Sequence, residues 1–87
     1  MDANKESSGN ISLRLSYPEA VVLAELLWRW ERDGTQDKLP LADQAEQRVL
    51  WDLTASFEPL IDEVFDKDAY VAALSHSRRQ VRDSNER

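Results

Sequence analysis

Few side chains in this sequence belong to the types that perform catalysis. The 87 residues include one histidine, no cysteine and only two glycines, Gly9 and Gly34. Neither a thiolate metal site nor a glycine-rich phosphate loop can therefore form. His76 stands between Ser75 and Ser77 and has no second histidine one helical turn away to complete a metal pair. We expect His76 to face solvent, and we predict a protein that is not an enzyme and has no catalytic residue and no cofactor.

The other chemistry-bearing residues form an acidic cluster. Asp62, Glu63, Asp66 and Asp68 lie close together in the sequence, and hard divalent cations prefer carboxylate oxygens. The cluster nevertheless lacks the alternating ligands, the central glycine and the final carboxylate of a calcium-binding EF-hand loop. We expect Asp66 and Asp68 to favour the start of a helix electrostatically, while the other two keep a turn soluble. The sequence predicts no metal site.

The three tryptophans carry more information than the polar residues do. Trp28 and Trp30 are two positions apart, which is about 200° around a helix, so they cannot both point into one core. The helix that contains them is therefore apolar on more than one face. Two alternatives remain open for the second face: the segment Leu39–Leu41 folds over it, or another chain covers it.

One strand is expected before this helix. Apolar and polar side chains alternate over residues 11–16, which read Ile11, Ser12, Leu13, Arg14, Leu15 and Ser16. Alternation is typical of a half-buried β-strand, and no other segment shows it convincingly. Because a lone strand leaves both edges unpaired, we predict antiparallel pairing with the same strand of a second subunit in a homodimer. The predicted interface residues are Ile11, Leu13, Leu15, Trp28 and Trp30.

The helix that follows the strand has clear start and stop signals. Ser16 is the expected N-cap, Glu19 completes a capping box with it, and Pro18 lies in the first turn, where its missing N–H is harmless. The apolar spacing continues to about Asp33, and Gly34 suits the position after the helix. The pattern predicts a helix of about four turns.

Two further helices are expected. Asp43 and Glu46 offer a second capping box, and Pro59 should end that helix near Phe57 because proline breaks a helix interior. A short turn follows, and Asp66 is the expected N-cap of the third helix. The apolar stripe of this helix is Tyr70, Leu74 and Val81.

These elements predict a mainly α fold: a short N-terminal β-strand followed by three helices in a small bundle, with the strand paired across a dimer. Residues 1–10 are polar and are expected to form a disordered tail, residues 11–82 a single helical domain, and residues 83–87 a frayed C-terminal tail. A chain of this length has room for one core only, and its stability is marginal unless association adds apolar contact.

Acidic side chains outnumber basic ones. Seventeen Asp and Glu residues against 11 Lys and Arg residues give a formal net charge of -6, which repels phosphate and anionic lipid headgroups at long range. We therefore do not expect nucleic acid as the principal partner.

No stretch approaches the roughly 20 apolar residues of a membrane span, and residues 1–10 lack the apolar core of an export signal. We expect a cytoplasmic protein with no membrane contact, and a reducing cytosol fits the absence of cysteine.

The strand over residues 11–15, followed at once by a capped helix, resembles the opening of ribbon-helix-helix DNA-binding proteins over a quarter of the chain. In that family the outward side chains of a dimeric ribbon read bases in the major groove. The resemblance implies DNA contacts at Ser12, Arg14 and Ser16. Only Arg14 is basic, however, and carboxylates at the start of the second helix would oppose phosphate.

A second resemblance covers the segments Leu15–Leu27 and Asp43–Leu53, which are similar to a group of short bacterial proteins with no assigned function. It implies only that the strand-plus-helices layout recurs. Together these observations predict an acidic, self-associating bacterial module for protein interaction or regulation, with an unidentified protein partner. The alternative is a ribbon-helix-helix-like DNA-binding transcriptional regulator.

Overall fold

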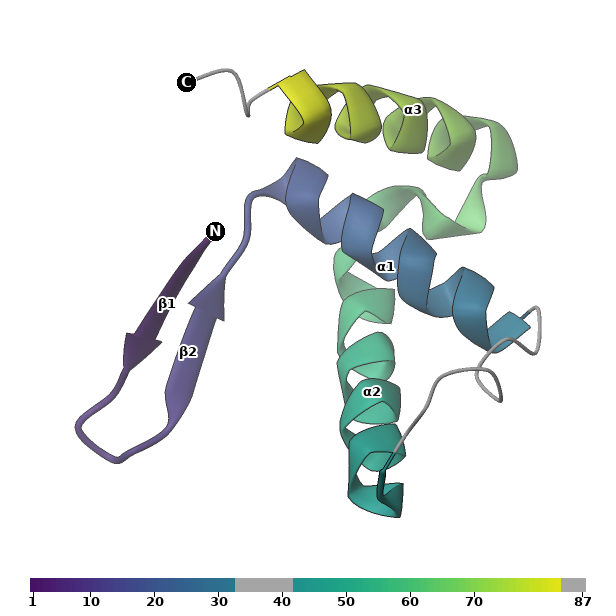
Figure 1. The fold of residues 1–87 in the computed structure, drawn as a ribbon. Coiled ribbons are helices and arrows are strands. Elements are labelled where there is room, and N and C mark those ends of the chain that lie inside the picture. Colours follow the sequence, from purple (N-terminus) through teal and green to yellow (C-terminus); the bar gives the residue numbers. More distant parts are fainter. Residues whose placement is uncertain (33–41, 84–87) are drawn as a thin grey trace.

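The computed structural model of the chain describes residues 1–32 and 42–83, and this part is mostly helical with one two-stranded antiparallel sheet. The predicted mainly α class is confirmed. The elements in chain order (Figure 1) are β1 (Asp2–Lys5), β2 (Ile11–Arg14), α1 (Tyr17–Arg32), α2 (Gln44–Phe57), the short 3₁₀ helices η2 (Glu58–Leu60) and η3 (Asp62–Phe65), and α3 (Lys67–Asp83).

The N-terminal segment differs from the sequence prediction. Residues 2–5, expected in a disordered tail, form β1 and pair with β2 in the same chain, so the prediction of a single strand is wrong. The turn explains the pairing: Glu6 N–H donates to the Asn10 carbonyl at 2.8 Å, and Gly9 N–H donates to the Glu6 carbonyl at 2.9 Å. Gly9 has a φ of 96°, a left-handed conformation that glycine adopts without steric cost.

The start of α1 is confirmed as a capping box. Glu19 N–H donates to Ser16 Oγ at 3.2 Å, and Ser16 N–H donates back to Glu19 Oε1 at 2.8 Å. The two bonds satisfy backbone donors that a helix start otherwise leaves unpaired. Helix α1 extends to Arg32, the last residue described before the gap, and the expectation for Gly34 lies outside the described residues.

The other helix boundaries follow the predicted signals closely. Asp43 caps α2 by accepting from Ala45 N–H at 2.7 Å, while Glu46 reaches back one residue further than expected and accepts from Ala42 N–H at 2.7 Å. Helix α2 ends at residue 57, just before the η2 turn that contains Pro59. Asp66 then accepts from Ala69 N–H at 3.1 Å and caps α3. The frayed tail was predicted for residues 83–87: residue 83 is the last residue of α3, and residues 84–87 lie outside the described residues.

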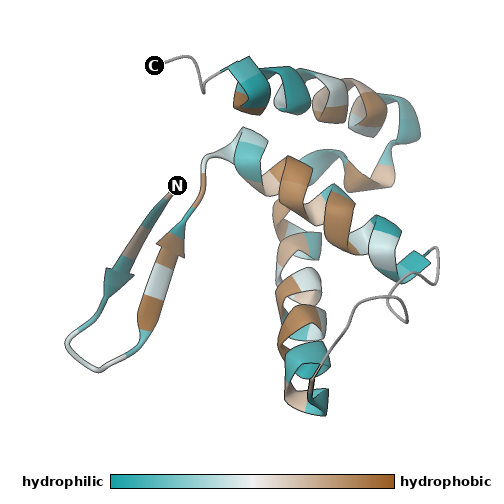
Figure 2. Cartoon of the chain, viewed as in Figure 1, coloured by the Kyte–Doolittle hydropathy of each residue, from teal (hydrophilic) through white to brown (hydrophobic). Residues whose placement is uncertain are grey.

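The core forms where α1 meets α2, α3 and the η turns (Figure 1). Figure 2 shows strongly apolar segments on α1, the helix that the other two contact. The buried apolar cluster consists of Val21, Ala24, Leu27, Phe57, Ile61 and Leu74. Because these side chains come from α1, α2, α3 and the segment between η2 and η3, their burial holds all three helices in one unit.

Two tyrosines tie α1 to the second half of the chain. The Tyr17 hydroxyl donates to Glu63 Oε1 at 2.7 Å and accepts from Asp62 N–H at 3.0 Å. The Tyr70 hydroxyl donates to Glu25 Oε1 at 2.7 Å. Burial, and then the neighbouring carboxylate, raise the pKa of both phenols. Both groups are therefore hydrogen-bond donors at neutral pH and help to fix how α1 crosses α3.

Glu25 is a charged residue in a nearly buried position. Its side chain accepts the Tyr70 hydroxyl and lies 3.8 Å from a guanidinium nitrogen of Arg29 and 3.8 Å from one of Arg32. Burying a carboxylate without partners costs roughly several kcal/mol of folding free energy, and these contacts offset that cost.

Among the described helices, none combines the length and the apolar character needed to cross a membrane.

Candidate interaction surface

The hairpin of β1 and β2 has one mainly apolar face, which also carries Lys5, and one polar face. Directly opposite residues share a face, and the register pairs Ala3 with Leu13 and Lys5 with Ile11. The other face carries the pairs Asp2 with Arg14 and Asn4 with Ser12. Every residue of both strands is exposed, including Ile11 at 66 % and Leu13 at 52 % of their surface. The sheet thus presents uncovered apolar side chains to solvent.

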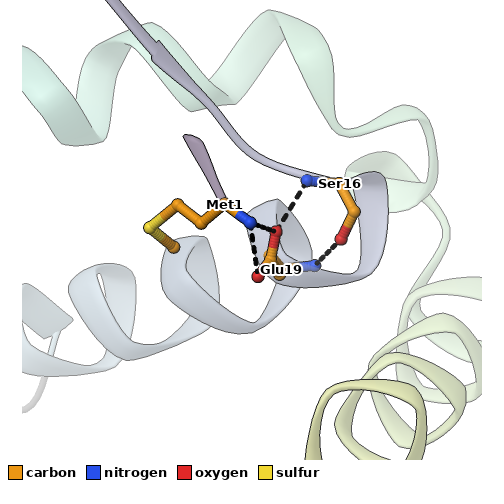
Figure 3. Close-up of polar contacts among 3 residues, drawn as sticks. All are labelled: Met1, Ser16 and Glu19. Carbon is orange, nitrogen blue, oxygen red and sulfur yellow. Dashed lines mark hydrogen bonds and ion pairs between the residues drawn. The ribbon is translucent and has the colours of Figure 1, made fainter. Parts of the chain in front are cut away.

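The base of the hairpin is fastened to the start of α1 by one carboxylate. Figure 3 shows Glu19 between the Met1 ammonium and Ser16. The ammonium lies 3.3 Å from Oε1 and 3.4 Å from Oε2 of Glu19, and Ser16 N–H donates to Oε1 at 2.8 Å. The bond from Ser16 N–H lowers the pKa of Glu19, and the ammonium lowers it further. Glu19 is therefore ionised at neutral pH and holds both segments.

Leu15 marks the point where the hairpin joins the helical body. It follows β2 directly, is partly buried, and packs against the apolar core. Leu13 and Ile11 lie two and four residues earlier on the same face, and each is more than half exposed. Apolar residues therefore continue from the core along β2 into solvent, and Figure 2 shows the strongly apolar segments of this strand in brown.

The structure does not bring the five predicted interface residues to one surface. Trp30 is buried, with 8 % of its surface exposed, and Trp28 is partly buried with its ring 6.2 Å from the Tyr70 ring. Helix α1 contacts both α2 and α3, so the chain itself covers much of the two-faced helix. Only Ile11 and Leu13 remain on an open surface. The alternative that involved Leu39–Leu41 lies outside the described residues.

Exposed apolar side chains also occur on the helical body. They come from α1, α2, η2, η3 and α3: Leu26, Val49, Trp51, Leu60, Phe65 and Val71. Single exposed apolar residues are normal on protein surfaces and do not by themselves indicate a binding site. The hairpin differs because its apolar residues share one face of a sheet whose strands are exposed along their whole length.

The residues implied by the ribbon-helix-helix resemblance lie beside carboxylates or cap a helix. Arg14 lies directly across from Asp2, which offsets its charge. The Ser12 hydroxyl donates to a Glu6 carboxylate oxygen, and Ser16 caps α1. The polar face thus carries carboxylates beside its one cation. This arrangement does not favour phosphate.

The candidate catalytic and metal-binding residues are dispersed. His76 is exposed on α3, and Glu63 accepts the Tyr17 hydroxyl. Asp66 is occupied in capping α3. In residues 1–32 and 42–83, no three histidine or acidic side chains lie in position to hold a metal ion. The feature of the described surface with the clearest chemical character is the amphipathic hairpin.

Comparison of the chain with protein-family models, with curated protein sequences and with solved structures found no significant match. A role for this chain must therefore be inferred from its own surfaces. The hairpin offers two means of binding: an apolar face that another apolar surface can cover, and open strand edges that another strand can extend.

Proposed function

We propose that this chain is a small acidic protein-interaction module that self-associates and binds protein through its N-terminal hairpin. The observation that carries the proposal is the amphipathic hairpin with an uncovered apolar face, on which Ile11 is 66 % and Leu13 52 % exposed. Covering these two side chains would contribute about 1 to 2 kcal/mol each, since full burial of such residues contributes roughly 1.5 to 3 kcal/mol.

The isolated state of the hairpin supports the same conclusion. Two strands of four residues are marginal in water, and a sheet becomes stable when a third strand or a packed surface adds to it. The hairpin is joined to the body through Leu15 and the Glu19 contacts, while its strands stay exposed. A binding partner would supply the missing contacts.

The charge of the chain favours protein over nucleic acid or anionic lipid as that partner. A net charge of -6 repels phosphate at long range, and Arg14, the one cation on the polar face of the hairpin, lies across from Asp2. Small acidic proteins of this kind act as inhibitors, antitoxin-like binders or regulatory subunits. The absence of cysteine is compatible with work in a reducing compartment such as the bacterial cytoplasm.

The test is the solution mass, measured by sedimentation equilibrium at micromolar concentration, for the wild type and two variants. Leu13→Asp places a charge on the hairpin face, while Leu26→Asp places the same charge on α1 at a leucine with nearly equal exposure, 51 % against 52 %. We expect a wild-type mass about twice the 10.0 kDa of one chain, a monomer for Leu13→Asp and a dimer for Leu26→Asp. A monomeric wild type, or equal effects of the two variants, would refute the proposal.

A further inference from the structure

Each strand of the hairpin has one open edge, and the two edges differ in character. β1 reads Asp2-Ala3-Asn4-Lys5, with charges at both ends and residues that are poor strand formers. Charged side chains, lysine above all, are the means by which natural sheets discourage further pairing at an edge. β2 reads Ile11-Ser12-Leu13-Arg14 and carries one charge, at its end. The open edge of β2 is therefore the one suited to receive another strand.

The backbone of β2 directs its free hydrogen-bonding groups to that edge. The turn closes with Glu6 N–H donating to the Asn10 carbonyl at 2.8 Å. In an antiparallel ladder, hydrogen-bonded pairs alternate with pairs that share no hydrogen bond. The pair after the turn, Lys5 with Ile11, is therefore a pair without mutual hydrogen bonds, and so is the pair of Ala3 with Leu13. The N–H and C=O groups of Ile11 and Leu13 consequently point away from β1.

The sequence of β2 is complementary to itself in one register. When two copies pair antiparallel about a two-fold axis through Leu13, Leu13 lies opposite Leu13 of the second copy, and Ile11 opposite Leu15 of the second copy. Ile11 and Leu13 direct their backbone groups to the shared edge and lie on the mainly apolar face, and Leu15, the residue after β2, continues their alternation. A slip of one residue would set apolar against polar side chains. A register centred on Ser12 keeps the faces matched but runs sooner into the turn at Gly9.

Charge also permits this register. Arg14 faces Ser12 of the second copy and keeps Asp2 beside it on its own β1, so two arginines are not directly opposed. Each copy contributes one carboxylate and one guanidinium from its strands to the polar face. Figure 1 shows the hairpin outside the packed helices, with β2 as the strand nearer to α2 in this view.

We infer that the partner of the hairpin is a second copy of this chain, joined along the open edge of β2 with Leu13 on the two-fold axis; the inference rests on the self-association proposed above. The product is a four-stranded antiparallel sheet in the order β1, β2, β2, β1. Its apolar face carries Ile11, Leu13 and Leu15 from each copy and is continuous at both Leu15 positions with the two helical cores. A sheet is stable in water when it has three or more strands and an apolar face, and the four-stranded sheet meets this requirement whereas the single hairpin does not.

Single cysteines test the register, because the natural sequence has none. A directly opposite, hydrogen-bonded antiparallel pair has Cα atoms about 5.5 Å apart, within the roughly 4.4 to 6.8 Å that a disulfide spans. Full-length Leu13→Cys should therefore form a covalent dimer under mild oxidation. Ser12→Cys should stay uncrosslinked, since the two copies of residue 12 are diagonal neighbours at roughly 7 to 8 Å. Ala3→Cys on the outer strand should also stay uncrosslinked.

The outcomes separate this inference from the proposed function. Rapid disulfide formation by Leu13→Cys alone would support it. Disulfide formation by Ser12→Cys instead would overturn the Leu13-centred register, and by Ala3→Cys would overturn the choice of β2. A dimeric mass without crosslinking at any of the three positions would refute edge pairing and leave self-association standing. A monomeric mass for the unmodified chain would refute both.

Discussion

The helical body and the hairpin are stabilised by different means. In the body, Val21 and Ala24 have no exposed surface, and the core joins α1, α2 and α3. In the hairpin, every strand residue is exposed, and the two strands are held by the turn, the ladder and polar contacts such as that of Met1 with Glu19. The body therefore has the contacts that a fold needs, while the hairpin has the open surface that binding needs. Separating the two lets a short chain keep a core and still present a sheet.

The polar contacts of the two regions also differ in how far they are buried. Tyr70 and Glu25 bond to each other in a nearly buried setting, where loss of one partner leaves the other unsatisfied. The Met1 and Glu19 contact is solvent-exposed, and such ion pairs contribute little to stability. We expect damage to the body to reduce folding stability and damage to the hairpin to reduce association.

The largest expected effect comes from one residue type changed in both regions. Ile61 is 2 % exposed in the core, so Ile61→Ala should lower the free energy of unfolding by about 2 to 5 kcal/mol, because it leaves a cavity. Ile11 is 66 % exposed, so Ile11→Ala should change the stability of the dilute monomer by less than about 0.5 kcal/mol. Urea unfolding in dilute solution measures both. Equal losses would contradict the division between the regions.

A smaller effect is expected from removing one hydroxyl in the body. Tyr70→Phe keeps the ring beside Trp28 but leaves the Glu25 carboxylate without its donor, which should cost about 1 to 3 kcal/mol. Thermal unfolding followed by circular dichroism measures the loss. Glu25→Gln in the same background is the control: an uncharged side chain should restore part of the stability. No loss in Tyr70→Phe would show that the contact does not stabilise the body.

A local effect is expected at the turn of the hairpin. Gly9 has a φ of 96° and open space around the position of a Cβ atom, so Gly9→Ala brings backbone strain without a clash, at about 1 kcal/mol. Gly9→Asn is the matched variant, because asparagine tolerates a positive φ better. Cross-strand nuclear Overhauser effects should weaken more in Gly9→Ala than in Gly9→Asn, with helical circular dichroism unchanged in both. A loss of helix in either would contradict the independence of the two regions.

The smallest effect concerns acid pH at the base of the hairpin. The pKa of Glu19 is lowered in the fold, so its contribution is present above its unfolded pKa and is lost as the pH falls through the folded value. Protonation weakens the contacts with the Ser16 N–H and the Met1 ammonium. Amide shifts of β1 should move in this acid range, and Glu19→Gln should remove the transition. An unchanged transition in Glu19→Gln would assign it to another carboxylate.

The helix boundaries could be predicted because their causes are local. Ser16 with Glu19, the Asp43 and Asp66 caps, and Pro59 after α2 each act within one turn of the chain. Such contacts depend on neighbouring residues, so spacing in the sequence reveals them. The same reasoning identified β2, because its apolar and polar side chains alternate.

β1 and the tryptophan environment could not be predicted in this way. Residues 2–5 show no apolar alternation, and they form a strand because they pair with β2 across a turn. That turn depends on the positive φ of Gly9, which the sequence alone does not give. The burial of Trp30 depends on how α1 is packed in the folded chain, which is a tertiary property. Of the predicted interface residues, Ile11 and Leu13 therefore lie on the open surface, whereas Trp28 and Trp30 belong to the body.

The most direct test of the account is amide hydrogen exchange on the full chain at low and high protein concentration. If the hairpin is the association surface, the N–H groups of Ile11 and Leu13 should exchange rapidly in dilute solution and become protected as concentration rises. The N–H groups of Ala24 and Leu27 in the core should show the same protection at both concentrations. Hairpin protection that does not change with concentration, together with helical amides that do, would contradict the central claim.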